Sequence, residues 1–236
     1  MGCEPRESDH SGEEMKYMIN KKGKLIVIDG TDGSGKATQT KLLVKRLKES
    51  GIRVRTLDFP QYVSNFFGKL LDECLHGKQQ GFSMLDPHIT SVLYAADRFE
   101  SKKKIERWVN DGYVVVLDRY VSANQIHQGG KISDARRRGK FLSWLDTMEY
   151  EVFGIPRPDI VVHLSIPVEF SLDLLLREKK IDAVESDRLY LENSARTAEW
   201  LSKKQRWTKV SCVRSGSLRT IDSIHEEIFN RVKRVL

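Results

Sequence analysis

The stretch GTDGSGK, residues 30–36, constrains the fold more than any other part of this sequence. It follows an apolar run, Lys24–Asp29, which predicts a buried strand, and it opens a helical pattern that begins at Lys36. Three glycines in six residues allow backbone N–H groups to turn toward one anion. The helix adds the positive end of its dipole, and the lysine adds a full charge. The segment therefore predicts a phosphate-binding loop between a strand and a helix.

The loop departs from the usual pattern at one position. Ala37 stands where a Ser or Thr hydroxyl normally contacts a magnesium ion. Thr38 does not replace it, because successive side chains on a helix are rotated by about 100°. We therefore expect magnesium to be held mainly by phosphates, water and carboxylates. Asp118, which ends an apolar strand, is expected to contribute through water; the alternative is that it only caps the following turn.

The length of 236 residues, with 39% hydrophobic, suits one domain or a core with a small lid. No apolar stretch approaches the roughly 20 residues of a membrane-spanning helix. Residues 1–20 are polar and lack the apolar centre of a signal peptide, so we interpret them as a flexible extension. Arg6 stands where a myristoylation motif after Gly2 requires Ser or Thr.

The net charge of +7 indicates anionic partners, either a nucleic acid or small phosphorylated molecules. Charge alone does not choose between them. The cysteines, Cys3, Cys74 and Cys212, are far apart and show no metal-binding or disulfide spacing. Because Cys74 and Cys212 lie in apolar periodic stretches, we expect buried free thiols and a reducing, cytoplasmic setting.

Strand-like and helical patterns alternate from residue 24 onward, which predicts an α/β domain, residues 21–236, with a five-stranded parallel sheet flanked by helices. Such sheets bind ligands beyond the carboxyl ends of their strands, and GTDGSGK, DFPQY and DRYVSANQ each follow a strand. The predicted strands are 24–29, 53–57, 113–118, 160–164 and 207–213. The predicted helices are 36–49, 65–75, 86–109, 134–152, one from 168, one before 207, and one capped by Asp222 or Ser223 that runs to about 235.

Four short motifs occur in the order GTDGSGKATQ, FPQY, LYAADR and DRYVSANQIHQG. Together they resemble the thymidylate kinase family, and the resemblance runs from about Lys24 to the C-terminus. It implies a P-loop nucleoside monophosphate kinase fold with a mobile lid, and a homodimer. It also implies transfer of the γ-phosphoryl group of ATP to dTMP with magnesium, which yields dTDP for dTTP biosynthesis.

For ATP, the resemblance implies that the loop surrounds the phosphates while cations lie between two mutually repelling substrates. Positioning and charge neutralisation then supply most of the catalysis. The expected ATP-binding residues are Gly30, Thr31, Asp32, Gly33, Ser34, Gly35, Lys36, Ala37 and Thr38, and the expected catalytic residues are Lys36, Arg119, Asp32 and Arg177.

For the acceptor phosphate, the resemblance implies a wall formed by Phe59 and Pro60, with Tyr62 close by. Arg119 of the DRY motif is expected to grip this phosphate, because its planar fork suits phosphate oxygens. Asp32 resembles a carboxylate near the deoxyribose or the metal.

For the base and sugar, the resemblance implies that Tyr94 stacks on thymine and Arg98, one helical turn later, donates to the base. Asn124 and Gln128 are expected to make further contacts. By pattern alone, Tyr94 would be a core residue and Arg98 a solvated one. His127 stands where family members often carry an aromatic residue, and we expect a polar pocket wall rather than a general base.

The interior of the loop contains no arginine, so we expect a lid at about 177–188 to supply the catalytic cation. Arg177 is the preferred residue. The alternative is an ordinary solvent-facing charged helix. Other lid cations are Lys179, Lys180 and Arg188, and Asp182 and Glu185 resemble lid carboxylates.

Two other functions remain open from the residues. One is another P-loop nucleotide or nucleoside kinase; a thymine methyl group is worth only about 1–3 kcal/mol, so dUMP is an expected slower substrate. The other is a non-catalytic nucleotide-binding or nucleic-acid-binding module, which Ala37 and the charge favour. The basic residues are scattered and no nucleic-acid motif occurs, so we expect neither nucleic acid nor membrane as a partner. The long helix, 86–109, is the expected dimer element.

Overall fold

The computed structural model describes residues 22–76, 81–178 and 188–236. Several sequence-based expectations therefore lie outside the described residues. These are the N-terminal extension 1–20, with Cys3, and most of the expected lid, with Lys179, Lys180, Asp182 and Glu185.

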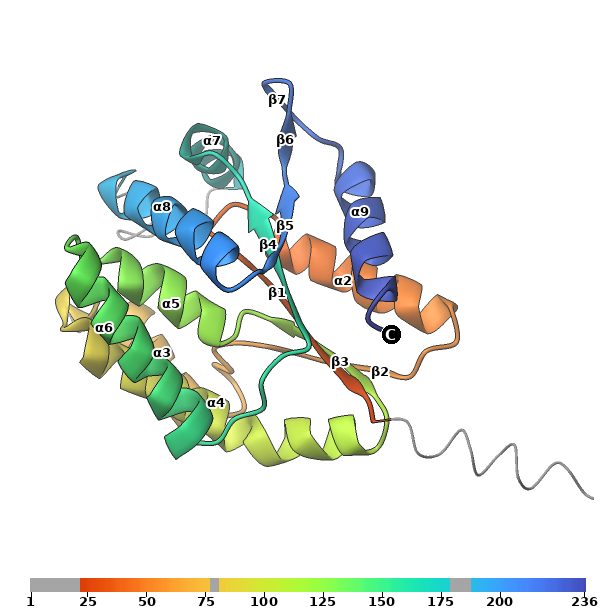
Figure 1. The fold of residues 1–236 in the computed structure, drawn as a ribbon, viewed down its shortest axis with the longest axis horizontal. Coiled ribbons are helices and arrows are strands. Elements are labelled where there is room, and N and C mark those ends of the chain that lie inside the picture. Colours follow the sequence, from red (N-terminus) through yellow and green to blue (C-terminus); the bar gives the residue numbers. More distant parts are fainter. Residues whose placement is uncertain (1–21, 77–80, 179–187) are drawn as a thin grey trace, which may run out of the picture.

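A five-stranded parallel sheet forms the centre of the molecule (Figure 1). Its order is β2-β3-β1-β4-β5, so the strand that precedes the glycine-rich loop lies in the middle. Because all neighbouring pairs are parallel, the carboxyl ends of the strands meet at one edge. The strands are β1 (Lys24–Gly30), β2 (Val54–Asp58), β3 (Val114–Asp118), β4 (Ile160–Ser165) and β5 (Thr208–Ser211).

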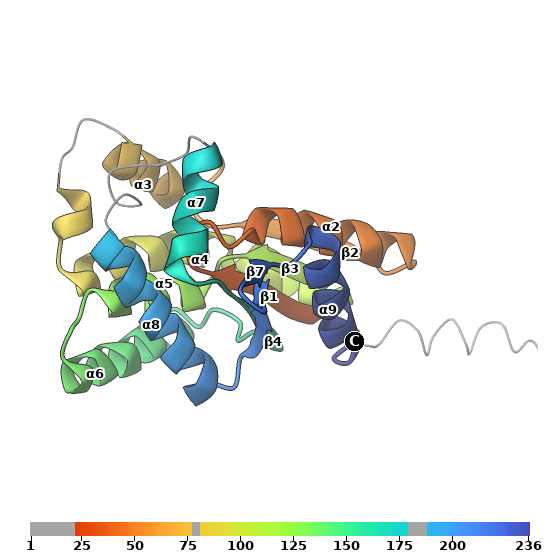
Figure 2. The ribbon, with the colours of Figure 1, turned by 90° about the horizontal axis from the view of Figure 1, so that it is seen from above.

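Helices cover both faces of the sheet, with α2 and α9 side by side on one of them (Figure 2). A short antiparallel hairpin, β6 (Val213–Arg214) and β7 (Ser217–Leu218), follows β5. The α-helices are α2 (Lys36–Glu49), α3 (Phe66–His76), α4 (Pro87–Asn110), α5 (Val121–Gly130), α6 (Ala135–Asp146), α7 (Val168–Glu178), α8 (Arg188–Lys204) and α9 (Ile221–Lys233). A 3-10 turn, η1 (Phe82–Met84), precedes α4, and a π-helical segment, η2 (Thr147–Val152), follows α6.

Alternate residues of β1 pack on opposite faces, as the period of a strand requires. Ile26 and Ile28 join the cluster formed with α2 and α9, whereas Leu25 and Val27 join the cluster formed with α4. All four are 0–1% exposed. A strand apolar on both faces is typical of a parallel sheet covered on both sides, which explains the continuous apolar run before the loop.

The five-stranded parallel sheet is confirmed, but several element boundaries were wrong. Helix α5 was not predicted, because its buried residues are largely polar and face a cavity, so the apolar period is missing. The helix predicted over 134–152 ends at Asp146 and continues as a π-helix. The fifth strand stops at Ser211 rather than 213, because Val213 begins the hairpin.

Two smaller expectations also need correction. The last helix is capped by Thr220, whose side chain accepts from the Ser223 N–H, and not by Asp222 or Ser223. Cys212 is a buried free thiol as predicted, whereas Cys74 is only partly buried.

In the part of the chain that the structure describes, no helix has the length and apolar character needed to cross a membrane.

Candidate functional site

The glycine-rich loop joins the end of β1 to the start of α2 at the central strand of the sheet. Gly33 and Gly35 have φ angles of 72° and 81°, which are left-handed conformations that favour glycine. Gly35 is the N-cap of α2 and has no side chain to cap the helix. The N–H groups of the first turn of α2 therefore have no intrahelical acceptor, and they form the anion-binding end of the helix.

Lys36, Asp32 and Arg119 form a charged cluster beside the loop. Lys36 Nζ donates to the carbonyl of Thr31 at 2.8 Å and lies 3.7 Å from Asp32 Oδ1. Arg119 Nη2 donates to the same carboxylate oxygen. Burial disfavours ionisation of Asp32, but the charges of Arg119 and Lys36 outweigh it and lower the pKa of Asp32. The carboxylate thus stays ionised and holds two cations in place.

Arg119 has an unusual backbone conformation. Its φ is 64°, a left-handed angle that is uncommon for a residue with a side chain. Its N–H donates to the carbonyl of Ile28, which fixes the chain directly after β3. Burial by itself would lower the pKa of Arg119, but the negative charges of Asp32 and Asp29 outweigh this effect and raise it. The guanidinium therefore remains a cation. The strained turn points to a functional demand on the direction of this side chain.

Asp29 and Ser122 support the loop and were not found by sequence reasoning. Asp29 is fully buried and accepts from the Gly30 N–H at 2.8 Å and from Ser122 Oγ at 2.5 Å. Burial raises the pKa of Asp29. A carboxylate inside an otherwise apolar strand was the available signal, since such a group needs partners when buried. This pair links the loop to the start of α5.

Asp118 ends β3 next to the cluster, in register with Ile28 of β1 and Asp58 of β2. It is half-buried, and burial raises the pKa of its carboxyl group against the opposing charges of Lys36 and Arg119. Ala37 is exposed at the start of α2 and supplies no oxygen ligand. Within residues 22–76, 81–178 and 188–236, no three His, Cys, Asp or Glu side chains group as a metal site. The donors present suit an ion held largely by phosphates and water.

A cavity of about 770 Å³ opens beside the charged cluster, and Asp32 and Arg119 line it. Its volume suits a nucleotide-sized ligand. The structure brings all nine residues expected to bind the acceptor nucleotide to this cavity, from loops after β2 and β3 and from α4 and α5. They are Phe59, Pro60, Tyr62, Tyr94, Arg98, Arg119, Asn124, His127 and Gln128.

His127 lies between Arg119 and Tyr190 in the cavity wall. Its Nε2 is 3.1 Å from Arg119 Nη1, and its Nδ1 is 2.8 Å from the Tyr190 hydroxyl. Because a guanidinium can only donate, Nε2 must accept, which places the proton on Nδ1. Burial lowers the pKa of His127 to about 4, so the ring is neutral near pH 7. Tyr190 on α8 was missed because the pattern of that helix shows nothing beyond amphipathicity.

Arg98 departs from the solvated position that its helix pattern predicted. It is 2% exposed, and its Nε and Nη2 donate to both oxygens of Glu149, at 2.7 and 2.5 Å. Such bidentate pairing fixes the plane of the guanidinium. Glu149 was also missed, since no local motif marks it.

Helix α4 contributes two further residues to the cavity wall, Thr90 and Tyr94. Tyr94 is partly buried and lines the cavity, so it lies in the pocket wall rather than in the closed core. Burial raises the pKa of Tyr94, which keeps the hydroxyl protonated. Thr90 Oγ1 donates to Gln128 Oε1 at 2.8 Å and orients that amide. Thr90 and Asn193, a lining residue from α8, were not predicted.

The expected lid cation is not at the cavity in this structure. Arg177 lies near the end of α7, its side chain 70% exposed, and donates to Asp173 at 2.7 Å on the same helix. Arg188 at the start of α8 likewise pairs with Glu192 on its own helix. Neither arginine is among the residues that line the cavity.

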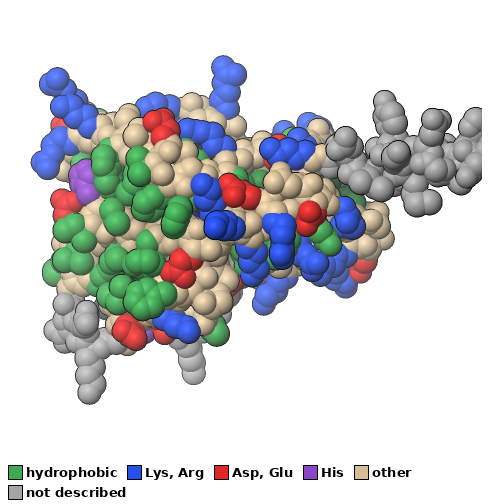
Figure 3. Space-filling model, turned by 90° about the horizontal axis from the view of Figure 1, so that it is seen from below, with side chains coloured by type: hydrophobic (Ala, Val, Ile, Leu, Met, Phe, Trp, Pro, Cys, Tyr) green, Lys and Arg blue, Asp and Glu red, His purple; other side chains and the backbone are tan. Residues whose placement is uncertain are grey.

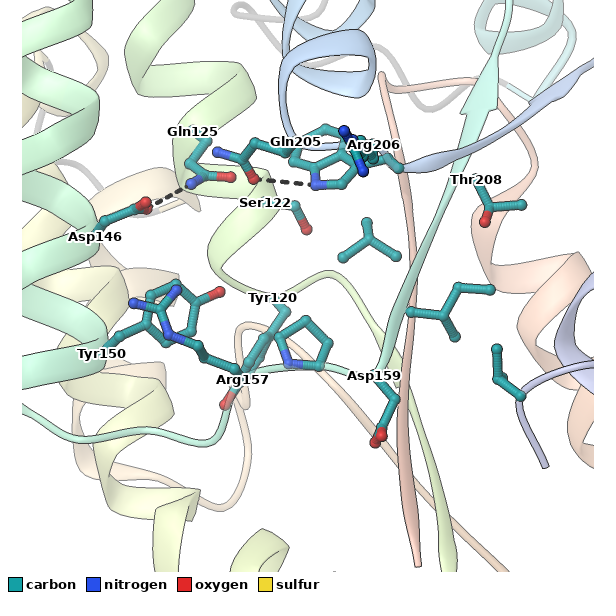
Figure 4. Close-up of a pocket in the computed structure, with 15 residues that line it drawn as sticks. Tyr120, Ser122, Gln125, Asp146, Tyr150, Arg157, Asp159, Gln205, Arg206 and Thr208 are labelled. Carbon is teal, nitrogen blue, oxygen red and sulfur yellow. Dashed lines mark hydrogen bonds between the residues drawn. The ribbon is translucent and has the colours of Figure 1, made fainter.

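A second cavity of about 350 Å³ lies near the amino-terminal end of β4 (Figure 4). Asp159 and Ile160 line it, and it shares no lining residue with the larger cavity. Gln125 of α5 donates to Asp146 of α6 at 2.7 Å within its wall. No residue of the glycine-rich loop lines this second cavity, whereas Asp32 of the loop lines the larger one.

Comparisons with known proteins agree with this geometry. A family model described as thymidylate kinase matches residues 28–228. The chain is 26% identical over 215 residues to a thymidylate kinase of Schizosaccharomyces pombe, which covers 91% of this chain and 93% of that protein. It is 30% identical over 217 residues to a probable thymidylate kinase of Pyrococcus abyssi, which covers 91% and 98%. It is 32% identical over 149 residues to a thymidylate kinase of Homo sapiens, which covers 63% and 64%.

Proposed function

The chain belongs to the thymidylate kinase family, and on that premise we propose that it transfers the γ-phosphoryl group of ATP to dTMP, giving ADP and dTDP. One observation carries the proposal: Arg119 and Asp32 belong both to the cluster at the phosphate loop and to the wall of the nucleotide-sized cavity. A donor phosphate in the loop and an acceptor phosphate in the cavity would therefore meet at Arg119.

The residues of the cluster divide the work of phosphoryl transfer. The N–H groups at the start of α2 and the Lys36 ammonium group bind the donor phosphates, and the Arg119 guanidinium binds the acceptor phosphate. Asp32 holds both cations before the substrates enter, so little reorganisation is needed during the reaction. Alignment and charge neutralisation account for the catalysis, and no side chain needs to transfer a proton in this scheme.

Magnesium is the ion this family implies, and the donor set fits it. Asp118 would hold the ion through water, and the remaining ligands would be phosphate oxygens and water, since Ala37 offers no hydroxyl. When bound, the ion neutralises charge on the phosphates.

The acceptor end is proposed to bind thymine between Tyr94, Arg98, Asn124 and Gln128, with Phe59 and Pro60 behind the phosphate. His127, neutral and fixed between Arg119 and Tyr190, forms the wall near the sugar. Arg177 is proposed to swing from Asp173 onto the ATP phosphates as the lid closes. An exposed pair within one helix stabilises little, so exchanging this partner costs little.

We also propose a homodimer in the cytoplasm, with neither nucleic acid nor membrane as a partner. Hydrophobic side chains gather over α3, α4 and the neighbouring segments on one face of the molecule (Figure 3). On α4, Ile89, Val92 and Phe99 are 39–55% exposed and recur at helical spacing along one stripe. A contiguous apolar face of this kind fits a second copy of the chain.

An ADP-release assay on the purified protein tests the proposed activity. With ATP and magnesium, dTMP should be the best acceptor, dUMP a slower one, and AMP and CMP poor ones. A preference for AMP or CMP would assign the chain to another substrate. Tight, salt-sensitive DNA binding without ATP turnover would favour the non-catalytic alternative.

A further inference from the structure

Glu149 connects two residues of the nucleotide cavity without lining the cavity itself. It is fully buried in η2 and accepts hydrogen bonds from Arg98 on α4 and Asn124 on α5. The π-helical turn brings it there: the Phe153 N–H donates to the Met148 carbonyl, five residues earlier, at 2.9 Å. Such turns are rare and are often found at functional sites.

On Arg98, Glu149 occupies one edge of the guanidinium. Nε donates to Oε2 at 2.7 Å and Nη2 donates to Oε1 at 2.5 Å. Nη1 makes no hydrogen bond with any described residue, and Arg98 lines the cavity. The group left for a ligand at this position can therefore only donate.

On Asn124, Glu149 fixes which end of the amide faces the cavity. Asn124 Nδ2 donates to Glu149 Oε1 at 3.1 Å and to the Ser91 carbonyl at 3.2 Å. Both partners can only accept, because the carboxylate is paired with an arginine, so the NH₂ group must point at them. The Oδ1 atom remains, and it accepts no hydrogen bond from the described residues. The group left for a ligand here can only accept.

We propose that Glu149 is a positioning residue that sets this donor–acceptor pair and thereby selects the base. A pyrimidine with a carbonyl at C4 and an N–H at N3, thymine or uracil, matches Arg98 as donor and Asn124 as acceptor. Cytosine reverses both groups, with an amino group at C4 and a bare nitrogen at N3. The inference rests on the proposed function, in which the larger cavity holds the acceptor nucleotide.

Glu149→Gln tests the inference with almost no change in shape. A glutamine places an NH₂ group in front of at least one donor of Arg98, because Nε and Nη2 pair with different oxygens of Glu149, so the guanidinium loses one of its two anchors. The guanidinium would then no longer be fixed for donation to the C4 carbonyl of the base. We expect the KM for dTMP to rise and the ratio of kcat/KM for dTMP over dCMP to fall by roughly tenfold or more, with the KM for ATP within about twofold of wild type.

Asp146→Asn is the matched control. Asp146 also accepts from α5, through Gln125, and it lies near Glu149 in sequence, but it lines the second cavity (Figure 4). It should lower thermal stability without changing the dTMP over dCMP ratio. A purely structural Glu149 would behave in the same way, so an unchanged ratio in a folded Glu149→Gln enzyme overturns the inference.

Glu149→Asp covers the case in which the glutamine variant does not fold. The shorter side chain no longer reaches both Arg98 and Asn124, so dTMP should bind more weakly. Because its carboxylate can still only accept hydrogen bonds, the preference for dTMP over dCMP should stay within about threefold of wild type. An unchanged KM for dTMP in this variant contradicts the inference. Failure of the proposed function is distinct, because wild-type protein would then not prefer dTMP as the acceptor.

Discussion

At the scale of single residues, the part of the candidate site beside the glycine-rich loop consists of charged side chains that form ion pairs with one another. Asp32 is bound by Lys36 and Arg119 at once, and the two cations lower its pKa despite burial. Ala37 is the one position of the loop where a usual ligand is missing. We expect this substitution to affect metal binding rather than phosphate binding, because the proposed phosphate contacts come from backbone N–H groups, which do not depend on this side chain.

Ala37→Ser should leave kcat within about twofold of wild type and lower the magnesium concentration needed for half-maximal rate, because a hydroxyl is a good magnesium ligand. Steady-state rates over a magnesium titration measure this. Ala37→Cys is the control: its thiol is similar in size but a poor ligand for a hard cation, so its magnesium dependence should match wild type. An inactive serine variant would contradict the expectation.

His163 provides a pH test away from the site. It is 3% exposed in β4, and burial lowers its pKa to about 4 from the usual 6.5. Between these pH values the unfolded chain binds a proton that the folded chain does not, so stability falls as the pH decreases. The loss from this group should reach at most about 3 kcal/mol by pH 4.

Urea unfolding at several pH values measures that loss. In His163→Gln the decrease in unfolding free energy between pH 6.5 and pH 4 should be smaller than in wild type. Identical pH dependence in the wild type and His163→Gln would show that His163 does not titrate differently on unfolding.

At the scale of elements, the loop is shaped by its contact with α7. Ser171 Oγ donates to the Asp32 carbonyl at 2.6 Å, and a Cβ on Gly33 would lie 2.7 Å from the Ser171 carbonyl. A Cβ on Gly35 would meet nothing within 4 Å. Both glycines have left-handed φ angles, so the two positions differ in space but not in backbone preference.

Gly33→Ala and Gly35→Ala form a matched pair. Each should lose about 1–2 kcal/mol of stability from the left-handed backbone, and Gly33→Ala should lose a further ~1–3 kcal/mol because α7 must move. Chemical denaturation gives the stabilities, and titration with ATP gives the affinities. Equal stabilities for the two variants would mean that α7 does not press on the loop.

At the scale of the whole molecule, the apolar face over α3 and α4 predicts self-association (Figure 3). Phe99 is 49% exposed and packs against Phe153 at a centroid distance of 5.2 Å, so it is partly anchored while its outer surface remains open. An aromatic anchor of this kind contributes strongly when a second copy covers it.

Phe99→Glu should raise the dissociation constant of the dimer by roughly tenfold or more, because it places a charge in an apolar interface. Sedimentation velocity over a concentration series measures the dimer fraction. Leu218→Glu on the distant hairpin is the control and should remain dimeric. A wild-type protein that is monomeric at all concentrations would exclude the proposed dimer.

The local sequence determined the sheet, the loop and most of the site. The central strands β1 and β3 are apolar on both faces and end at glycine or charged residues, so their positions could be predicted from the apolar runs in the sequence. All nine residues that the motifs predicted for the acceptor site line the same cavity, although they come from four separate segments of the chain. These features depend on neighbours in the chain, which is why the sequence carries them.

Tertiary structure decided the partners of those residues. Glu149 is hydrogen-bonded to Arg98 and Asn124, which are 51 and 25 residues away in the sequence. Tyr190 and His127 are likewise in contact although 63 residues separate them. Helix α5 has no apolar period because most of its buried side chains are polar and line the two cavities. Buried polar groups must find partners, but those partners need only be close in space, so no local pattern reveals them.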